Sequence, residues 1–249
     1  MGALHAGHQR LIQTARMECV VVVVSIFVNP LQFGPDEDYA RYPRTLPQDL
    51  DVCEDSGVDL AFAPSVEDMH SLPQRTFIEV ERLGSGLCGK FRPGHFRGVA
   101  TVVLKLLNIV QPHRAYFGEK DMQQLLIIRR MALDLNLPVT IVGVPTVRER
   151  DGLALSSRNK YLNDEERKAA PALYRALQEA VNRIHAGERN PARVREGALA
   201  VLTGPLIRVE YFEIVDPYEL QPVATISGRI LIAGAIWIGA TRLIDNLSL

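Results

Sequence analysis

Short apolar runs of strand character alternate with helical patterns over the first 145 residues, and this alternation limits the possible folds more than any other feature. Residues 20–28 are rich in β-branched side chains, which predicts a strand buried on both faces. Further strands are expected at residues 59–63, 115–117 and 139–144, and helices at residues 99–110 and 122–135. Strands that alternate with helices predict an α/β fold with a doubly wound, Rossmann-like parallel sheet.

The pattern changes after Pro145. Asn163 with Glu166 is typical of a helix N-terminus, here of a long polar helix to about residue 185. A second helix is expected after Asn190, followed by strands at residues 209–215, 229–238 and 241–247. The sequence therefore predicts a larger domain at residues 1–146 and a smaller C-terminal α+β domain at residues 147–249.

Composition narrows the class of protein. A formal net charge of -1 in 249 residues gives no general attraction for nucleic acid or acidic lipid, so neither is expected as a partner. The three cysteines lack CxxC spacing, which argues against a disulfide framework or a zinc site and favours a reducing cytoplasm. The longest apolar run is about half of the ~20 residues that a membrane helix needs, so a soluble protein is expected.

The first eight residues read Met-Gly-Ala-Leu-His-Ala-Gly-His and stand directly before a helical pattern. Gly7 would let the backbone approach a phosphate closely, and the helix N-terminus supplies N–H donors and a positive dipole. His5 and His8 could add hydrogen bonds to charge that develops on a phosphate. A turn with two exposed histidines explains the same letters, so the motif needs support from elsewhere in the chain.

Three other segments supply polar groups near the ends of expected strands, where ligands bind in open α/β sheets. Asn29 and Gln32 carry neutral amides that could recognise the oxygens of a small acid, although Asn29-Pro30 also suits an ordinary turn. Lys120 offers a point charge for phosphate, and Gln124 follows one helical turn later. Residues 155–159, Leu-Ser-Ser-Arg-Asn, place two hydroxyls beside a guanidinium that suits a polyphosphate.

Taken together these segments resemble the pantothenate synthetase family. The shared motifs are MGALHAGH, SIFVNPLQFGP, YPRT, RPGHFRGVATVVLKL, YFGEKDMQQL, VGVPTVRERDGLALSSRN and ATRLIDNL, in the family's order and across essentially all 249 residues. Single motifs are shared with other HxGH nucleotidylyltransferases and class I aminoacyl-tRNA synthetases, whereas the combination is specific. The resemblance implies an ATP-dependent ligase that adenylates pantoate and then joins it to β-alanine.

Carried over by position, the resemblance implies roles for individual residues. His8 is expected as a general acid, with His5 and Lys120 on the phosphates. The expected ATP-site residues are Met1, Gly2, Ala3, Leu4, His5, Ala6, Gly7, His8, Gly118, Glu119, Lys120, Asp121, Val147, Leu155, Ser156, Ser157 and Arg158. The acid or the amine is expected to meet Gln32, Gln124, Asn29 and Arg92, with His95 nearby. Asp49 is expected to face Mg²⁺ through water, and the protein is expected to be a homodimer with a lid around Ser156.

Members of this family also carry a helix and a buried strand before the MGALHxGH motif. The resemblance therefore implies a segment upstream of Met1. A start codon assigned too far downstream, a chain cut on purpose and a genuinely shortened copy would each explain why the sequence begins at the motif. Two rival functions follow from the same residues. One is a nucleotidylyltransferase that stops at adenylate transfer, and the other is an inactive remnant that only binds ATP.

Overall fold

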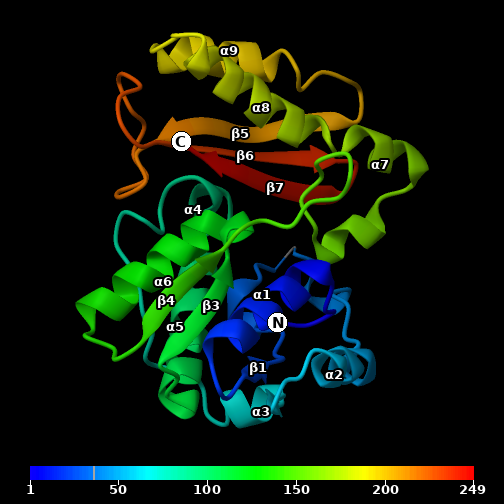
Figure 1. The fold of residues 1–249 in the computed structure, drawn as a ribbon, viewed down its shortest axis with the longest axis vertical. Helices are drawn as coiled ribbons and strands as arrows, with labels where there is room; N and C mark the ends of the chain where they lie inside the picture. Colours follow the sequence, from blue (N-terminus) through cyan, green and yellow to red (C-terminus); the bar gives the residue numbers. More distant parts are fainter. Residues whose placement is uncertain (36) are drawn as a thin grey trace. The chain divides into compact units, whose positions relative to one another are not determined.

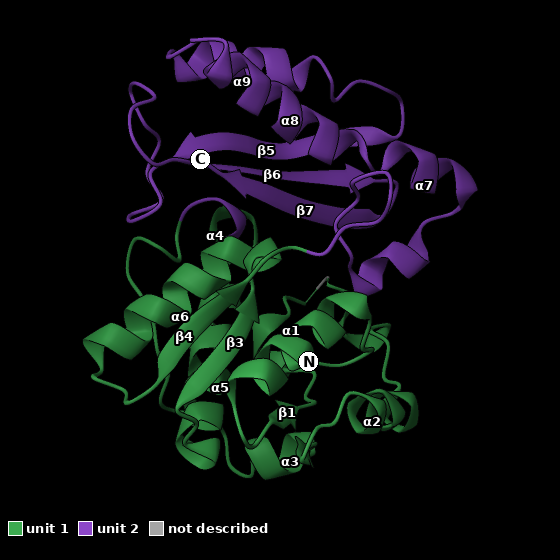
Figure 2. Cartoon of the chain, in the orientation of Figure 1, with its two compact units in different colours: residues 1–85, 89–146 green, residues 86–88, 147–249 purple. Residues whose placement is uncertain are grey.

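The computed structural model describes residues 1–35 and 37–249, which form two compact units (Figures 1 and 2). Unit 1 consists of residues 1–85 and 89–146. Unit 2 consists of residues 86–88 and 147–249. The long unit boundary falls between Thr146 and Val147, and the short segment 86–88 belongs to unit 2 although its neighbours in sequence belong to unit 1.

The described strands of unit 1 are paired in parallel, as the alternating pattern predicts. β1 (Val23–Ser25) pairs with β2 (Leu60–Phe62), and β3 (Arg114–Gly118) pairs with β4 (Thr140–Val144). These strands form two two-stranded sheets instead of one continuous ladder. Because the strands of each pair run in the same direction, the residues that follow them lie at a common edge, where sites in α/β proteins form.

The expected strand over residues 20–28 is wrong in its length. Val22, Val24 and Ile26 are buried, but Val20 and Val21 are 91% and 65% exposed. Strand pairing reaches only from Val23 to Ser25. Upstream of it the backbone is bound by side chains, because Arg16 donates to the carbonyls of Cys19 and Val20 and Asp59 accepts from the Val22 N–H.

The helices of unit 1 pack around these strands (Figure 1). The longer ones are α1 (Ala6–Glu18), α2 (Leu46–Asp55), α5 (His95–Val110) and α6 (Met122–Asp134). α3 (Val66–Met69) is a single turn, as is α4 (Cys88–Phe91), whose first residue belongs to unit 2 and whose other residues belong to unit 1. Short 3₁₀ segments are η1 (Pro30–Gln32), η2 (Asp38–Ala40) and η3 (Glu119–Asp121). Ile12 and Ala15 of α1 pack with Val22, Val24 and Ile26, so one face of this helix is buried against the segment that contains β1.

Unit 2 is an antiparallel sheet with helices over one face (Figure 1). The sheet order is β5 (Ile207–Val215), β6 (Leu231–Ile238) and β7 (Thr241–Ser248). Its helices are η4 (Ser157–Tyr161), α7 (Asp164–Ala169), α8 (Ala172–His185) and α9 (Pro191–Leu199). Fully buried side chains of α8, among them Leu177, pack with Phe212, Ile232 and Ile236 of the sheet, so the core of unit 2 lies between these layers.

The long helix expected after Asn163 is divided in two. Asn163 caps α7 and the Glu166 carboxylate accepts a hydrogen bond from the Asn163 N–H, which confirms the predicted N-terminus. The helix ends at Ala169, and α8 begins at Ala172 with Pro171 at its N-cap. Because proline has no N–H to donate and clashes with the preceding turn, Pro171 separates the two helices.

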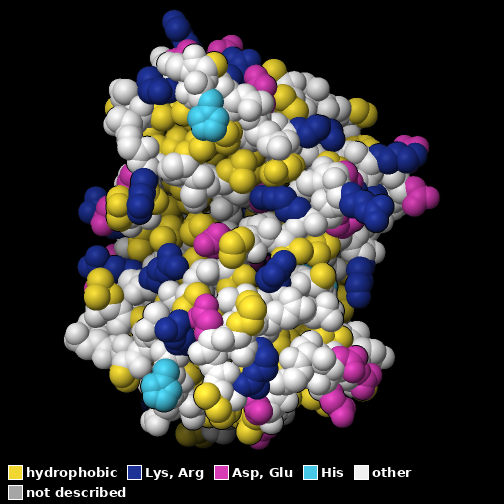
Figure 3. All heavy atoms as spheres, in the orientation of Figure 1, with side chains coloured by type: hydrophobic (Ala, Val, Ile, Leu, Met, Phe, Trp, Pro, Cys, Tyr) yellow, Lys and Arg dark blue, Asp and Glu magenta, His cyan; other side chains and the backbone are white. Residues whose placement is uncertain are grey.

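Charges are mixed on the face drawn in Figure 3, where lysine and arginine side chains are interspersed with acidic ones. This agrees with the net charge of -1. In the part of the chain that the structure describes, no helix is both long and apolar enough to cross a bilayer.

Candidate active site

The N-terminal turn of α1 is built from the two histidines of the HxGH motif. His5 is the N-cap, and its Nδ1 accepts a hydrogen bond from the Gly7 N–H at 3.1 Å. The Nδ1 of His8 accepts from the His5 N–H at 3.3 Å, which closes a reciprocal capping box. Since each Nδ1 is an acceptor here, each ring carries its proton on Nε2. The ring centroids lie 4.1 Å apart.

Burial keeps His8 neutral. The pKa of His8 is lowered from its ordinary value to about 2 by burial, and further by the nearby His5 and Lys120. An imidazolium at this position would lie in a poorly solvated place beside another cation, which explains the direction of the shift. At neutral pH His8 is therefore a neutral Nε2–H donor. The expected role of His8 as a general acid stays a prediction.

Asp49 holds the loop that precedes α1. Its Oδ2 accepts from the Ala3 N–H at 2.9 Å, and its Oδ1 accepts from the Leu4 N–H at 2.7 Å and from the Thr45 hydroxyl at 3.1 Å. Ala3 has a positive φ of 50°, an uncommon conformation that these bonds help to maintain. Asp49 is only 2% exposed. Both carboxylate oxygens of Asp49 thus already accept hydrogen bonds from protein groups, which disfavours the expected contact with a hydrated Mg²⁺, and that contact stays a prediction.

We expect Asp49→Asn to lower the melting temperature and the activity together. The substitution removes the charge that accepts two backbone N–H groups, and stranding buried donors costs roughly 1–3 kcal/mol. For a chain of this size that corresponds to a fall of about 2–12 °C. Thermal unfolding and activity assays over a Mg²⁺ titration check this. Recovery of the variant at high Mg²⁺ would return Asp49 to the role of a metal ligand.

The amide of Asn29 is used within the protein. Asn29 is 3% exposed, its Oδ1 accepts from the Leu31 N–H at 3.0 Å, and its Nδ2 donates to the Gly98 carbonyl at 3.1 Å and to Gln32 Oε1 at 3.3 Å. All of these groups belong to η1 or to α5, against which η1 packs. Asn29 therefore orients Gln32, and its expected contact with a ligand stays a prediction.

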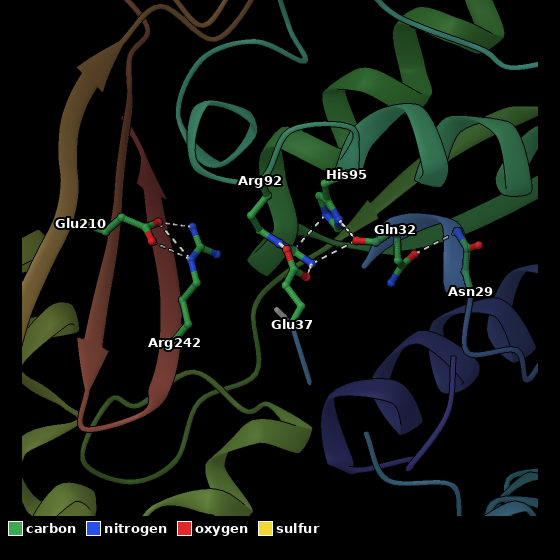
Figure 4. Close-up of polar contacts among 7 residues, drawn as sticks. All are labelled: Asn29, Gln32, Glu37, Arg92, His95, Glu210 and Arg242. Atoms are coloured by element: carbon green, nitrogen blue, oxygen red, sulfur yellow. Dashed lines mark hydrogen bonds and ion pairs between the residues drawn. The ribbon is translucent and has the colours of Figure 1, made fainter. Parts of the chain in front are cut away.

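Arg92 and His95 also bind protein groups where ligand contacts were expected (Figure 4). Arg92 forms an ion pair with Glu37 and donates to the Gln32 carbonyl at 3.2 Å. His95 lies 2.8 Å from the same carbonyl through Nδ1 and 3.1 Å from Arg92 NH1 through Nε2. Both ring nitrogens of His95 are thus engaged, and its pKa is lowered to about 4, chiefly by burial and also by Arg92.

Lys120 and Gln124 follow β3, as the sequence predicts. Lys120 stands in η3, is 20% exposed at its side chain and lies 3.6 Å from Asp121 Oδ1. Its charge contributes to the lowered pKa of His8. Gln124 is half-buried in the first turn of α6, and its neighbour Gln123 instead donates to the Leu83 carbonyl at 2.8 Å. Of these two neighbours, Gln123 is used within the protein, whereas Gln124 is the one that can meet a ligand.

Within unit 2 the serine-rich segment forms a tight turn. Ser156 is the N-cap of η4, and its Oγ accepts from the Arg158 N–H at 3.2 Å. The Leu155 N–H donates to the Val147 carbonyl at 3.0 Å, so the first residue of the segment is tied to an upstream part of unit 2. Asn159, which no site prediction included, stabilises the turn by donating to the Ala154 carbonyl at 3.1 Å. The conformation of residues 155–158 is therefore fixed within unit 2.

These features define a class of protein. A parallel α/β unit presents a neutral histidine donor at a helix N-terminus with a lysine nearby, and this arrangement suits an enzyme that handles phosphate esters. A family profile described as "Pantoate-beta-alanine ligase" matches residues 1–248. The chain belongs to this family.

Individual relatives support the assignment. The "Pantothenate synthetase" of Moorella thermoacetica is 55% identical over 250 residues, covering 100% of this chain and 88% of the relative. The crystal structure of the Thermus thermophilus enzyme superimposes with a TM-score of 0.95 at 52% identity, covering 99% of this chain and 90% of that one. A Francisella tularensis ligase, titled as complexed with "Beta-gamma ATP and Beta-alanine", gives a TM-score of 0.81 at 37% identity, over 99% of this chain and 86% of that one.

Proposed function

We propose that the α1 N-terminus and η3 carry the adenylation chemistry of this enzyme. The chain is an ATP-dependent, AMP-forming ligase that condenses pantoate with β-alanine to give pantothenate. In the first step a carboxylate oxygen of pantoate attacks the α-phosphorus of ATP, the bond to the bridging oxygen breaks and pyrophosphate leaves. In the second step the β-alanine nitrogen attacks the acyl carbon, AMP leaves and the amine loses a proton to solvent.

The neutral His8 ring at a helix N-terminus carries this proposal. Its Nε2–H is a fixed donor, because the capping box orients the ring, and fixed donors need little reorganisation when charge grows on the phosphate. His5 and Lys120 contribute a second ring N–H and a positive charge. The Asp49 carboxylate keeps the loop in place without contacting the nucleotide.

In unit 2 we propose that Ser156, Ser157 and Arg158 bind phosphate oxygens. The turn is fixed by the Ser156 cap and by the bond between Leu155 and Val147, which reduces the conformational entropy lost on binding. Backbone and side chains of residues 1–8, Gly118, Glu119, Asp121, Val147 and Leu155 complete the proposed ATP-binding set. A lid action of this unit and a cytoplasmic homodimer belong to the same proposal, and size-exclusion chromatography with light scattering tests the dimer.

The acid is proposed to bind the amides of Gln32 and Gln124. We expect Gln32→Ala and Gln124→Ala to raise the KM for pantoate and to leave the KM for ATP nearly unchanged. Losing a neutral hydrogen bond costs roughly 0.5–1.5 kcal/mol, so the expected rise is about 2- to 12-fold. Initial rates of pyrophosphate release, with each substrate varied in turn, measure both constants. Gln123→Ala is an informative comparison, because its buried amide serves Leu83 and should lower stability without this selectivity.

A further inference from the structure

We propose that Glu37 is a positioning residue for the acid substrate, acting through Arg92 and His95 on the main chain of Gln32. Glu37 does not reach the acid in this scheme. It fixes the one segment, η1, that presents the Gln32 amide. This inference rests on the proposed role of Gln32 in binding pantoate.

The Gln32 carbonyl is held from two sides. His95 Nδ1 lies 2.8 Å away, and Arg92 NH2 lies 3.2 Å away. Because a carbonyl oxygen only accepts, His95 carries its proton on Nδ1, and its Nε2 is then the acceptor for Arg92 NH1 at 3.1 Å. Arg92 and His95 thus both donate to the Gln32 carbonyl and are also hydrogen-bonded to each other, so both lone pairs of the carbonyl oxygen are used.

Glu37 completes this arrangement by fixing the guanidinium. Its Oε1 accepts from Arg92 Nε at 2.9 Å, and its Oε2 accepts from Arg92 NH2. The side chain of Arg92 is only 14% exposed, so its orientation depends on these partners more than on water. Burial opposes ionisation of Glu37, but the hydrogen bond and charge of Arg92 outweigh it, and the pKa of Glu37 is lowered below its usual value. The two hydrogen bonds to Glu37 hold the guanidinium of Arg92 in one orientation.

The other side of η1 is fixed against α5. Gly98 has no Cβ, and one built there would stand 2.0 Å from the Leu31 carbonyl oxygen, so only glycine permits this approach. Asn29 donates both to the Gly98 carbonyl and to Gln32 Oε1. Because Oε1 accepts from Asn29, the NH₂ group of Gln32 is the part of the amide proposed to meet the acid. It therefore offers donors, which suit the carboxylate or hydroxyl oxygens of an α-hydroxy acid.

A double-mutant cycle with Gln32 tests this inference. We expect Glu37→Ala to raise the KM for pantoate by at most as much as Gln32→Ala does, about 2- to 12-fold, because Glu37 acts on the acid only through Gln32. The KM for ATP and for β-alanine should stay within about twofold. In a Gln32→Ala background the same substitution should have almost no further effect on pantoate, because the group that it positions is gone. Glu37→Gln keeps an acceptor for Arg92 and should recover part of the affinity.

Asp134→Asn is the matched control, since it removes a carboxylate from an exposed ion pair with Arg130 on α6. It should leave all three KM values unchanged. Equal losses for pantoate and ATP, or additive effects of Glu37→Ala and Gln32→Ala, would overturn the positioning role. If Gln32→Ala alone left the pantoate KM unchanged, both this inference and the proposed acid site would fail. Absence of pantoate-dependent pyrophosphate release from the unsubstituted chain would instead refute the proposed function itself.

Discussion

Replacing His8 or Lys120 with alanine is expected to slow pyrophosphate release by ~10²–10³, the usual cost of removing one preorganised donor to a developing oxyanion. His8 is held as a neutral donor because burial lowers its pKa to about 2, and the charge of Lys120 is close enough to contribute to that shift. Neither side chain fills a hydrophobic core. The loss should therefore appear in the rate of adenylate formation and much less in the melting temperature.

The capping box complicates His8→Ala, because the His8 ring also accepts from the His5 N–H. Loss of such a cap costs about 1 kcal/mol, so a small fall in melting temperature is expected. Glutamine at this position can restore the reciprocal cap, which makes His8→Gln a control for stability. Gln13→Ala, on the exposed side of α1, should change neither rate nor stability. Adenylation within about threefold of the parent rate in either alanine variant would remove that residue from the mechanism.

Glu210→Ala is expected to destabilise unit 2 by about 3–5 kcal/mol, the usual cost of leaving one charge of a buried pair without its partner. Glu210 accepts from Arg242 Nε at 2.9 Å and from Trp237 Nε1 at 2.9 Å, and the side chains of Glu210 and Arg242 are 7% and 13% exposed (Figure 4). The substitution strands a guanidinium and an indole N–H within the sheet. A fall in melting temperature of about 10 °C follows.

Glu213→Ala provides the comparison on the same strand. Glu213 lies 3.8 Å from Arg195 and is 36% exposed at its side chain, so its pair is worth ~0–1 kcal/mol. Differential scanning calorimetry of both variants shows whether the loss of stability depends on burial of the charged pair or only on removal of a carboxylate. Equal melting temperatures for the two would mean that the Glu210 pair is as weak as a surface pair.

Local patterns predicted much of the fold because they report local physics. The Asn163 and Glu166 pair predicted the start of α7 correctly, since a capping box involves only neighbouring residues. Asn190-Pro191 likewise starts α9, with Asn190 accepting from the Ala192 N–H. Alternating apolar runs located β5 to β7 within a few residues. The exposed end of the 20–28 run was missed, because the length of a strand depends on its partner, and β2 offers only Leu60 to Phe62.

The expected site residues stay predictions, and the structure adds how their polar groups are used within the protein. His8 and Lys120 stand near each other, but which of their states is stable depends on burial that no motif shows. Asn29, Asp49 and Arg92 were expected at ligands, and the structure assigns their polar groups to Gly98, to the residues 3–4 backbone and to Glu37. Glu37 itself lies in an acidic stretch of sequence that predicts only an ordinary loop. Its partner is 55 residues away in sequence, which no local pattern can indicate.

The sequence by itself determined the parallel α/β unit, the antiparallel α+β unit, the family and the residues that gather at its motifs. Those properties follow from hydrophobic periodicity, capping and motif order, which are written in consecutive residues. Only the tertiary structure decided which of those polar side chains hold other parts of the protein. The reason is that a buried polar group must find a hydrogen-bond partner wherever the fold brings one, and that choice depends on residues far apart in the chain.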